Sequence, residues 1–142
     1  MNGFTIIEVV LVLAIAALIF LMVFIAVPAL QANQRDTERK HDAGLVSSAV
    51  TEYTSAYRTP LKTASDQVNL RKYVDELSGN YEGADSVFVK TGDTNVVPPI
   101  GEIWVHPATK CNGPDAEASG NSRTSTVRIR LENDTAYCVN AS

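Results

Sequence analysis

Charged residues are almost absent from the first quarter of the chain. Glu8 is the only one among the first 34 residues, and nothing ionises between Val9 and Leu30. No Lys or Arg precedes this apolar run, and no small-x-small cleavage pattern follows it. A secretory signal peptide usually has a basic start and an apolar region of about 7–15 residues, so both absences argue against one. As a helix the run spans roughly 33 Å, enough to cross a hydrocarbon core of about 30 Å once.

The rest of the chain lacks the patterns of an enzyme or a zinc site. Its two cysteines and two histidines, His41 and His106, do not have the paired spacing of zinc ligands. No glycine-rich phosphate loop or nucleophile motif is present. The net charge of −4 argues against a dedicated nucleic-acid surface. We therefore predict no catalytic residue, no cofactor, no metal and no specific nucleic-acid partner.

Calcium binding is a weaker alternative for one polar loop, because calcium prefers oxygen ligands. The simpler interpretation is a solvated loop. The oxygen-bearing residues concerned are Asn112, Asp115, Glu117 and Asn121.

Glu8 needs a partner, because a charged group at the centre of a helix in hydrocarbon costs about 2.5–3.5 kcal/mol, and less near an end. The residues leading to it, directly before the apolar run, are Gly3-Phe4-Thr5-Ile6-Ile7-Glu8. This segment resembles the processing site of type IV pilin precursors, and the resemblance extends from Gly3 to Leu30. Beyond that point it concerns the layout of the chain only.

The resemblance implies a processing and assembly scheme. A prepilin peptidase would cut after Gly3, which makes residues 1–3 a leader remnant and Phe4 the N-methylated terminus. Glu8 would neutralise the terminal amine of a neighbouring subunit. The expected function is that of a major pilin, which lies in the cell membrane, meets inner-membrane assembly machinery and joins identical subunits in a helical extracellular pilus. Adhesion and twitching motility are roles of such filaments.

Two other functions remain open. One is a pseudopilin or minor pilin of a type II secretion or DNA-uptake system, which would be scarce in purified fibres. The other is a single-pass anchor carrying a binding or enzymatic domain, which predicts activity from residues 31–142 alone.

The side of the membrane on which the C-terminal part lies bears on the cysteines. Arg35, Arg39 and Lys40 follow the apolar run, and the positive-inside rule alone would place that part in the cytoplasm. The pilin resemblance implies the opposite side, which is oxidising, and hence a disulfide between Cys111 and Cys138. The alternative is two free thiols in a cytosolic domain.

A single long helix is expected from about Phe4 into the fifties. Residues 4–30 would be its hydrophobic transmembrane or filament-core part, and residues 31–58 its amphipathic continuation, beginning with a solvated polar stretch. A kink or local break is predicted near Phe24 to Pro28, because proline removes a backbone donor, and a second break is predicted at Gly44, because glycine is a poor helix former. Apolar residues at spacings of three and four should pack on a sheet: Leu45, Val46, Ala49, Val50, Tyr53, Ala56 and Tyr57.

The remaining residues, 59–142, are predicted to form a globular head with an antiparallel sheet and a C-terminal disulfide loop. A short helix is expected at 69–77, and residues 110–125 should be an exposed loop. In the strand at 126–131, Val127 and Ile129 should face the core while Thr126 and Arg128 face water. The other strands are expected at 86–90, 102–106 and 135–139. The fold class is α+β, and the layout matches the ladle-shaped pilin architecture.

Overall fold

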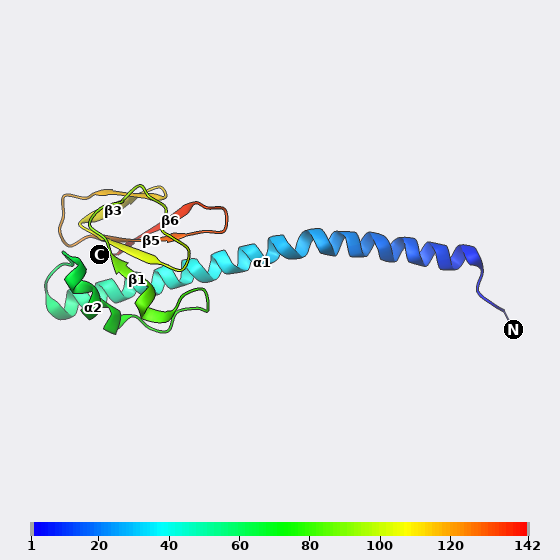
Figure 1. The fold of residues 1–142 in the computed structure, drawn as a ribbon, viewed down its shortest axis with the longest axis horizontal. Helices are drawn as coiled ribbons and strands as arrows, with labels where there is room; N and C mark the ends of the chain where they lie inside the picture. The colour runs from blue at the N-terminus through cyan, green and yellow to red at the C-terminus, as the bar shows by residue number, and fades with distance from the viewer. Residues whose placement is uncertain (1, 142) are drawn as a thin grey trace. The chain divides into compact units, whose positions relative to one another are not determined.

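The computed structural model describes residues 2–141, which form a mixed α+β fold with one long helix and a small sheet (Figure 1). By contacts the chain divides into two compact units, one ending at Gln34 and the other beginning at Arg35. The helical elements are α1 (Ile6–Tyr57), η1 (Ala64–Asp66), α2 (Gln67–Leu70), η2 (Arg71–Tyr73) and η3 (Gly83–Ser86). The strands are β1 (Val87–Val89), β2 (Ile103–Pro107), β3 (Thr109–Asn112), β4 (Asp115–Ala118), β5 (Ser125–Arg130) and β6 (Ala136–Ala141).

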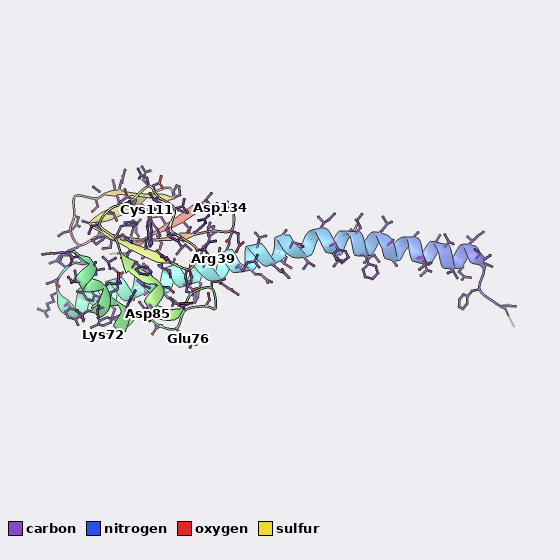
Figure 2. All side chains as sticks on the ribbon, in the orientation of Figure 1. Arg39, Lys72, Glu76, Asp85, Cys111 and Asp134 are labelled. Atoms are coloured by element: carbon purple, nitrogen blue, oxygen red, sulfur yellow. A yellow bond between two sulfur atoms is a disulfide. The ribbon has the colours of Figure 1, made fainter. Side chains whose placement is uncertain are left out.

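The first unit is the apolar part of α1, and its side chains project from the helix on all sides (Figure 2). The helix continues without interruption through Pro28, so the break predicted there is absent from this structure. Proline removes only the one hydrogen bond to the carbonyl of Phe24. Ala26, Ala29 and Leu30 beside it are strong helix formers, and the other backbone hydrogen bonds of the helix do not involve the proline nitrogen.

In the second unit, α1 packs on a four-stranded sheet of order β1-β2-β5-β6. The helix contributes a buried face that includes Val46, Val50 and Tyr53, which confirms the predicted stripe up to this point. Ala56 and Tyr57, at the end of the stripe, are instead exposed. Gly44 lies inside the helix, and the predicted break there is also wrong. Burial of the residues on both sides of it offsets its low helix propensity.

Two features of the sheet differ from the prediction. β1 and β2 pair in parallel, whereas β2 with β5 and β5 with β6 are antiparallel, so the sheet is mixed although mostly antiparallel. The region expected as an exposed loop contains the antiparallel hairpin β3–β4.

The hairpin covers the face of β5 that was predicted to be wet. Val127 and Ile129 belong to the core beneath α1, while Thr126 and Arg128 alternate with them and bond to the hairpin. Both faces of β5 are therefore buried. The short helix is also displaced. It runs from Ala64 to Tyr73 through η1, α2 and η2, and ends before the predicted limit.

Candidate assembly site

Thr5 lies directly before Ile6, the first residue of α1, so Glu8 falls in the first turn of the helix. The backbone carbonyl of Thr5 accepts hydrogen bonds from the N–H groups of Glu8 and Val9, at 3.2 and 3.3 Å. Its hydroxyl oxygen also lies 3.4 Å from the Glu8 nitrogen, so Thr5 acts as the N-cap of α1. A Thr followed three residues later by Glu is a capping-box pattern, and this signal in the sequence was missed.

Gly3 and Phe4, the predicted processing residues, lie before α1 and outside any regular element. The structure brings Phe4 and Glu8 together at one shallow hollow of about 340 Å³, which Val9, Val12 and Leu13 complete. A second apolar hollow of about 490 Å³ lies along the same segment, between Ile6 and Leu18. The two predicted assembly residues therefore share one apolar surface.

Glu8 forms no ion pair with any of the residues that the structure describes. Its position in the first turn is favourable for a carboxylate, because the N-terminal end of a helix carries partial positive charge. That local interaction is worth typically 0.3–1 kcal/mol, well below the cost of an unpaired charge buried in an apolar bundle. A cation from outside the chain is needed if this surface is covered.

The apolar segment is uncovered in the single chain. None of the most hydrophobic 18-residue window of α1 is buried, and Phe4 and Phe24 are 87% and 77% exposed. Within the described part of the chain, α1 is the one helix long and apolar enough to cross a membrane. Exposed apolar surface on this scale marks a site for lipid or protein contact.

Cys111 on β3 and Cys138 on β6 form a disulfide with a Cα–Cα distance of 5.8 Å, and Figure 2 labels Cys111. The bond attaches the β3–β4 hairpin to the last strand. The backbone N–H of Cys111 also donates to the Asn140 side chain at 2.8 Å. Closing a loop of this length is worth roughly 3–4 kcal/mol in the chain-entropy model.

The side chain of Arg128 on β5 is fully buried, and it holds the β3–β4 hairpin in place. It donates to the carboxylate of Asp115 at 3.1 Å and to the backbone carbonyls of Pro114, Asp93 and Val96. Asp115, offered above as a calcium ligand, is therefore used in this ion pair. Glu117 pairs with Lys110 at 3.1 Å. Among residues 2–141 there is no group of three or more His, Cys, Asp or Glu side chains that could hold a metal ion.

His106 on β2 is almost fully buried, and its position is structural. Its Nδ1 lies 3.1 Å from the carbonyl of Lys90, while its Nε2 is buried without a hydrogen-bond partner. Burial and, next in size, the nearby charge of Arg128 together lower the pKa of His106 from 6.5 to about 4. The imidazole is therefore neutral at neutral pH.

The polar part of α1 is attached to the sheet and is not simply solvated as predicted. Arg35 and Arg39 both reach the carboxylate of Glu132, at 2.9 and 3.0 Å. Asp36 accepts a hydrogen bond from the Glu132 backbone N–H at 2.9 Å. The hydrogen bond from Arg35, with the charge of Arg39, holds the pKa of Glu132 below its usual value. These bonds anchor this turn of α1 to the β5–β6 connection.

Comparisons of the chain with protein-family models, with curated proteins and with solved structures find no match. The long apolar N-terminal helix, the small sheet and the disulfide are together compatible with a pilin architecture. That compatibility rests on the chain's own residues and elements.

Proposed function

We propose that this protein is the structural subunit of a type IV pilus, held in the cell membrane by residues 4–30 and then assembled into an extracellular filament. The observation that supports this most is the uncovered apolar surface of α1, which carries one carboxylate, Glu8, at its start. An ordinary anchor requires the apolar length but not the carboxylate. A subunit that binds the amine of a neighbour requires both.

Transfer of this segment from lipid to a bundle of identical helices has a physical driving force. Both environments are apolar, so little is lost on leaving the membrane, and van der Waals packing between helices supplies much of the gain. In each contact, one patch of a subunit meets a different patch of its neighbour. Contacts of this heterologous kind that do not close into a ring generate a helical filament.

Glu8 sets the register of this packing. An ion pair in an apolar bundle adds little net stability over an apolar pair, but a charge without its partner costs about 3–5 kcal/mol. A subunit that slides along its neighbour separates Glu8 from the terminal amine of Phe4. Misaligned packing is therefore disfavoured, while the correct register is tolerated.

The head suits the extracellular side of the membrane. Its two cysteines form a disulfide, a bond that persists in oxidising compartments and is rare in the cytosol. The buried face of α1 beyond Gly44 and the sheet give the head a core of its own. The apolar segment is then free to serve as the contact between subunits.

Fractionation of cells that carry pilus assembly machinery tests the proposal. Filaments sheared from the surface should contain the wild-type chain as their main component, with unassembled chain in the membrane. A Gly3→Leu variant, which alters the predicted cleavage site but not the apolar segment, should remain in the membrane only. Wild-type chain that never leaves the membrane fraction would contradict the proposal, and chain present in filaments only as a trace component would favour a minor pilin.

A further inference from the structure

Two tripeptides of the form Asn-x-Ser/Thr, the acceptor pattern for N-linked oligosaccharides, occur in the chain. They are Asn133-Asp134-Thr135 and Asn140-Ala141-Ser142. A pattern this short arises by chance, so the sequence alone selects neither. An oligosaccharide is bulky and is attached at the surface, so the surroundings of each asparagine decide whether it is suited to carry one.

Asn133 lies on the turn that connects β5 to β6, and residues 132–135 of this turn are all exposed. Figure 2 labels Asp134, the middle residue of the tripeptide, on this turn. Backbone hydrogen bonds fix the turn: the N–H of Leu131 donates to the carbonyl of Thr135 at 2.9 Å, and the N–H of Asp134 donates to the carbonyl of Leu131 at 3.1 Å. The tripeptide is therefore presented at the surface in a defined conformation.

The side chain of Asn133 is oriented by Thr135. The Thr135 hydroxyl donates to Oδ1 of Asn133 at 2.6 Å, and the Thr135 backbone N–H donates to the same oxygen at 3.3 Å. A backbone N–H can only donate, so the amide oxygen must face Thr135 and the amide nitrogen must point away from it. That nitrogen, Nδ2, makes no hydrogen bond with any residue that the structure describes. The atom to which a sugar would be attached is thus unoccupied on an exposed residue.

Asn140 is held in the sheet on several sides. It lies within β6, where it pairs with Thr126 of β5. Its Oδ1 accepts the backbone N–H of Cys111 at 2.8 Å, and its backbone carbonyl accepts the hydroxyl of Ser47 at 3.1 Å. The last residue of its tripeptide lies outside the described residues. To enter a transferase this segment would have to leave the sheet, so the structure favours Asn133.

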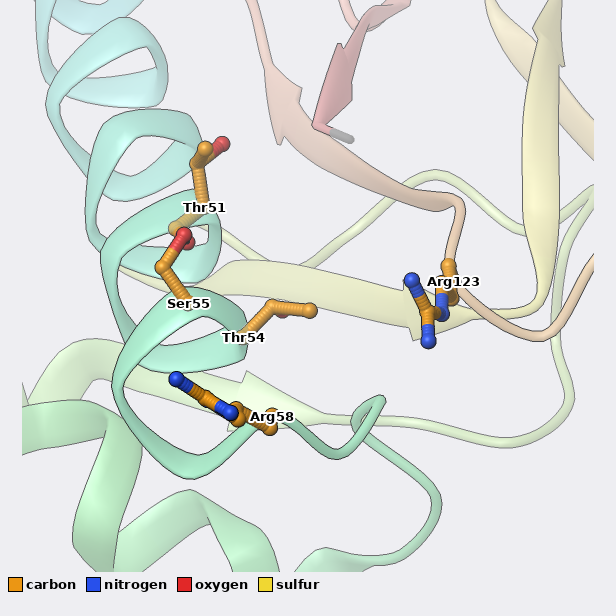
Figure 3. Close-up of a pocket in the computed structure, with 5 residues that line it drawn as sticks. All are labelled: Thr51, Thr54, Ser55, Arg58 and Arg123. Carbon is orange, nitrogen blue, oxygen red and sulfur yellow. The ribbon is translucent and has the colours of Figure 1, made fainter.

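The formation of a turn does not by itself explain the hydroxyl of Thr135. The loop from β4 to β5 contains the same kind of bond, because the backbone N–H of Arg123 donates to Oδ1 of Asn121 at 3.0 Å. Its third residue carries a guanidinium in place of a hydroxyl, and Figure 3 shows Arg123 across an open hollow from Thr54 of α1. This loop therefore has the geometry of the turn at Asn133 without the acceptor pattern, and it provides a matched position for the test.

We propose that Asn133 is the attachment site of an N-linked oligosaccharide, which a membrane transferase delivers from a lipid-linked donor outside the cytoplasm. Nδ2 of Asn133 forms a bond to the anomeric carbon of the first sugar and loses one proton. The bond between that carbon and a phosphate oxygen of the donor breaks, and the lipid-linked phosphate leaves with the bonding electrons. No oxidant or reductant is needed.

The inference rests on one part of the proposed function, the position of the head outside the cytoplasm, which the disulfide supports. It does not require assembly into a filament. A membrane-anchored chain with the same orientation would meet the same donor.

The mass of C-terminal fragments tests the inference on the full chain isolated from the cells that produce it. Membrane and filament fractions are reduced and digested with trypsin, which cleaves after Arg130, and with chymotrypsin, which cleaves after Tyr137 and so separates Asn133 from Asn140. The fragment 131–137 should carry the added mass of an oligosaccharide in whichever fraction contains the chain. The fragment that begins at Cys138 should be unmodified.

Variants of the tripeptide separate the acceptor pattern from the turn. Asn133→Gln and Thr135→Val should lose the added mass completely, whereas Thr135→Ser keeps a hydroxyl and should retain it. The melting temperatures of all three should stay close to that of the wild type, because both residues are exposed. Arg123→Thr completes the acceptor pattern on the β4–β5 loop and should add a second oligosaccharide, at Asn121.

Four results would overturn the inference. An unmodified Asn133 beside a modified Asn121 in Arg123→Thr would show that a transferase reaches the head but does not use this turn. Absence of sugar at both positions would show that the head meets no such transferase. A sugar on Asn140 with Asn133 unmodified would show that exposure on a turn does not decide the site. Added mass that persists in Thr135→Val would show another kind of attachment.

The same fractions keep this inference distinct from the proposed function. Modified chain that is found only in the membrane would support the inference and contradict assembly into filaments. Unmodified chain as the main component of filaments would do the reverse.

Discussion

The hydroxyl oxygen of Thr5 lies 3.4 Å from the backbone nitrogen of Glu8 and caps the first turn of the apolar helix. This contact fixes where α1 begins, and with it the place of the only carboxylate in the first 34 residues. Because Glu8 then lies near the helix N-terminus, its carboxylate stabilises the start of α1, in addition to its proposed role between subunits. The two roles predict different responses to mutation.

Replacing Glu8 by Ala should leave the protein in the membrane and reduce surface filaments at least about tenfold. Insertion depends on hydrophobicity, which the change increases, whereas assembly would lose the charge that we propose pairs with a neighbour's amine. The measurement is the amount of chain in sheared filaments relative to the membrane fraction. Wild-type amounts of filament would show that Glu8 does not set the register.

A Thr5→Val variant is the matched control for the local role of Glu8. It removes the cap and costs the helix start about 1 kcal/mol, but it keeps the carboxylate. Filament yield should stay close to that of the wild type. A loss as large as that of Glu8→Ala would assign the effect to the helix end.

Replacing both cysteines by Ser should lower the free energy of unfolding of the head by about 3–4 kcal/mol. The change releases the β3–β4 hairpin from β6 and frees a loop with a sequence separation of 27 residues in the unfolded chain. Denaturant unfolding of the oxidised wild type and the double variant measures the difference. Equal stabilities, or two alkylatable thiols in unreduced wild-type protein, would contradict the disulfide.

The buried imidazole of His106 should make the head less stable as the pH falls from about 6.5 to about 4. Its pKa is about 4 when folded, against 6.5 for the free side chain, so in this window the unfolded chain binds a proton that the folded chain does not. Stability rises with pH where the unfolded state binds more protons, so the effect amounts to a loss on the order of 3 kcal/mol on acidification.

Unfolding free energies of the wild type and His106→Gln between pH 7 and 5 provide the measurement. The variant should show a shallower dependence on pH. An unchanged slope in His106→Gln would show that burial does not hold this imidazole neutral.

Arg128→Met should destabilise the head by about 3 kcal/mol or more. The change leaves Asp115 without its cation, and it leaves the backbone carbonyls of Pro114, Asp93 and Val96 without this donor. Arg123→Met, on the exposed loop that leads into the same strand, should change stability by less than about 0.5 kcal/mol. Similar melting temperatures for the two variants would show that the bonds of Arg128 do not stabilise the head.

Local patterns in the sequence predicted the elements that bury one face. The three- and four-residue spacing of Val46, Val50 and Tyr53 marked the side of α1 that meets the sheet. Alternation at Val127 and Ile129 marked the core side of β5. Both signals work because a helix and a strand have fixed periods, so burial on one side leaves a readable repeat.

The features that the sequence did not predict depend on contacts between distant residues. The strands β3 and β4 are short and polar, and they are fixed by the disulfide, by Arg128 and by a turn in which Gly113 adopts a φ of 62°. The direction of the β1–β2 pairing has no local signature. The attachment of Arg35 and Arg39 to Glu132 joins residues more than 90 positions apart. The cap at Thr5 was readable as a capping pattern but was overlooked.

The mass of the N-terminal peptide of the protein isolated from intact surface filaments tests the central claim most directly. The expected result is a chain that begins at Phe4 and carries one added methyl group on its amine, because the proposed cleavage after Gly3 would bring that amine within reach of a neighbour's Glu8. A filament-borne chain that retains Met1 to Gly3 would place the amine elsewhere and would contradict the account.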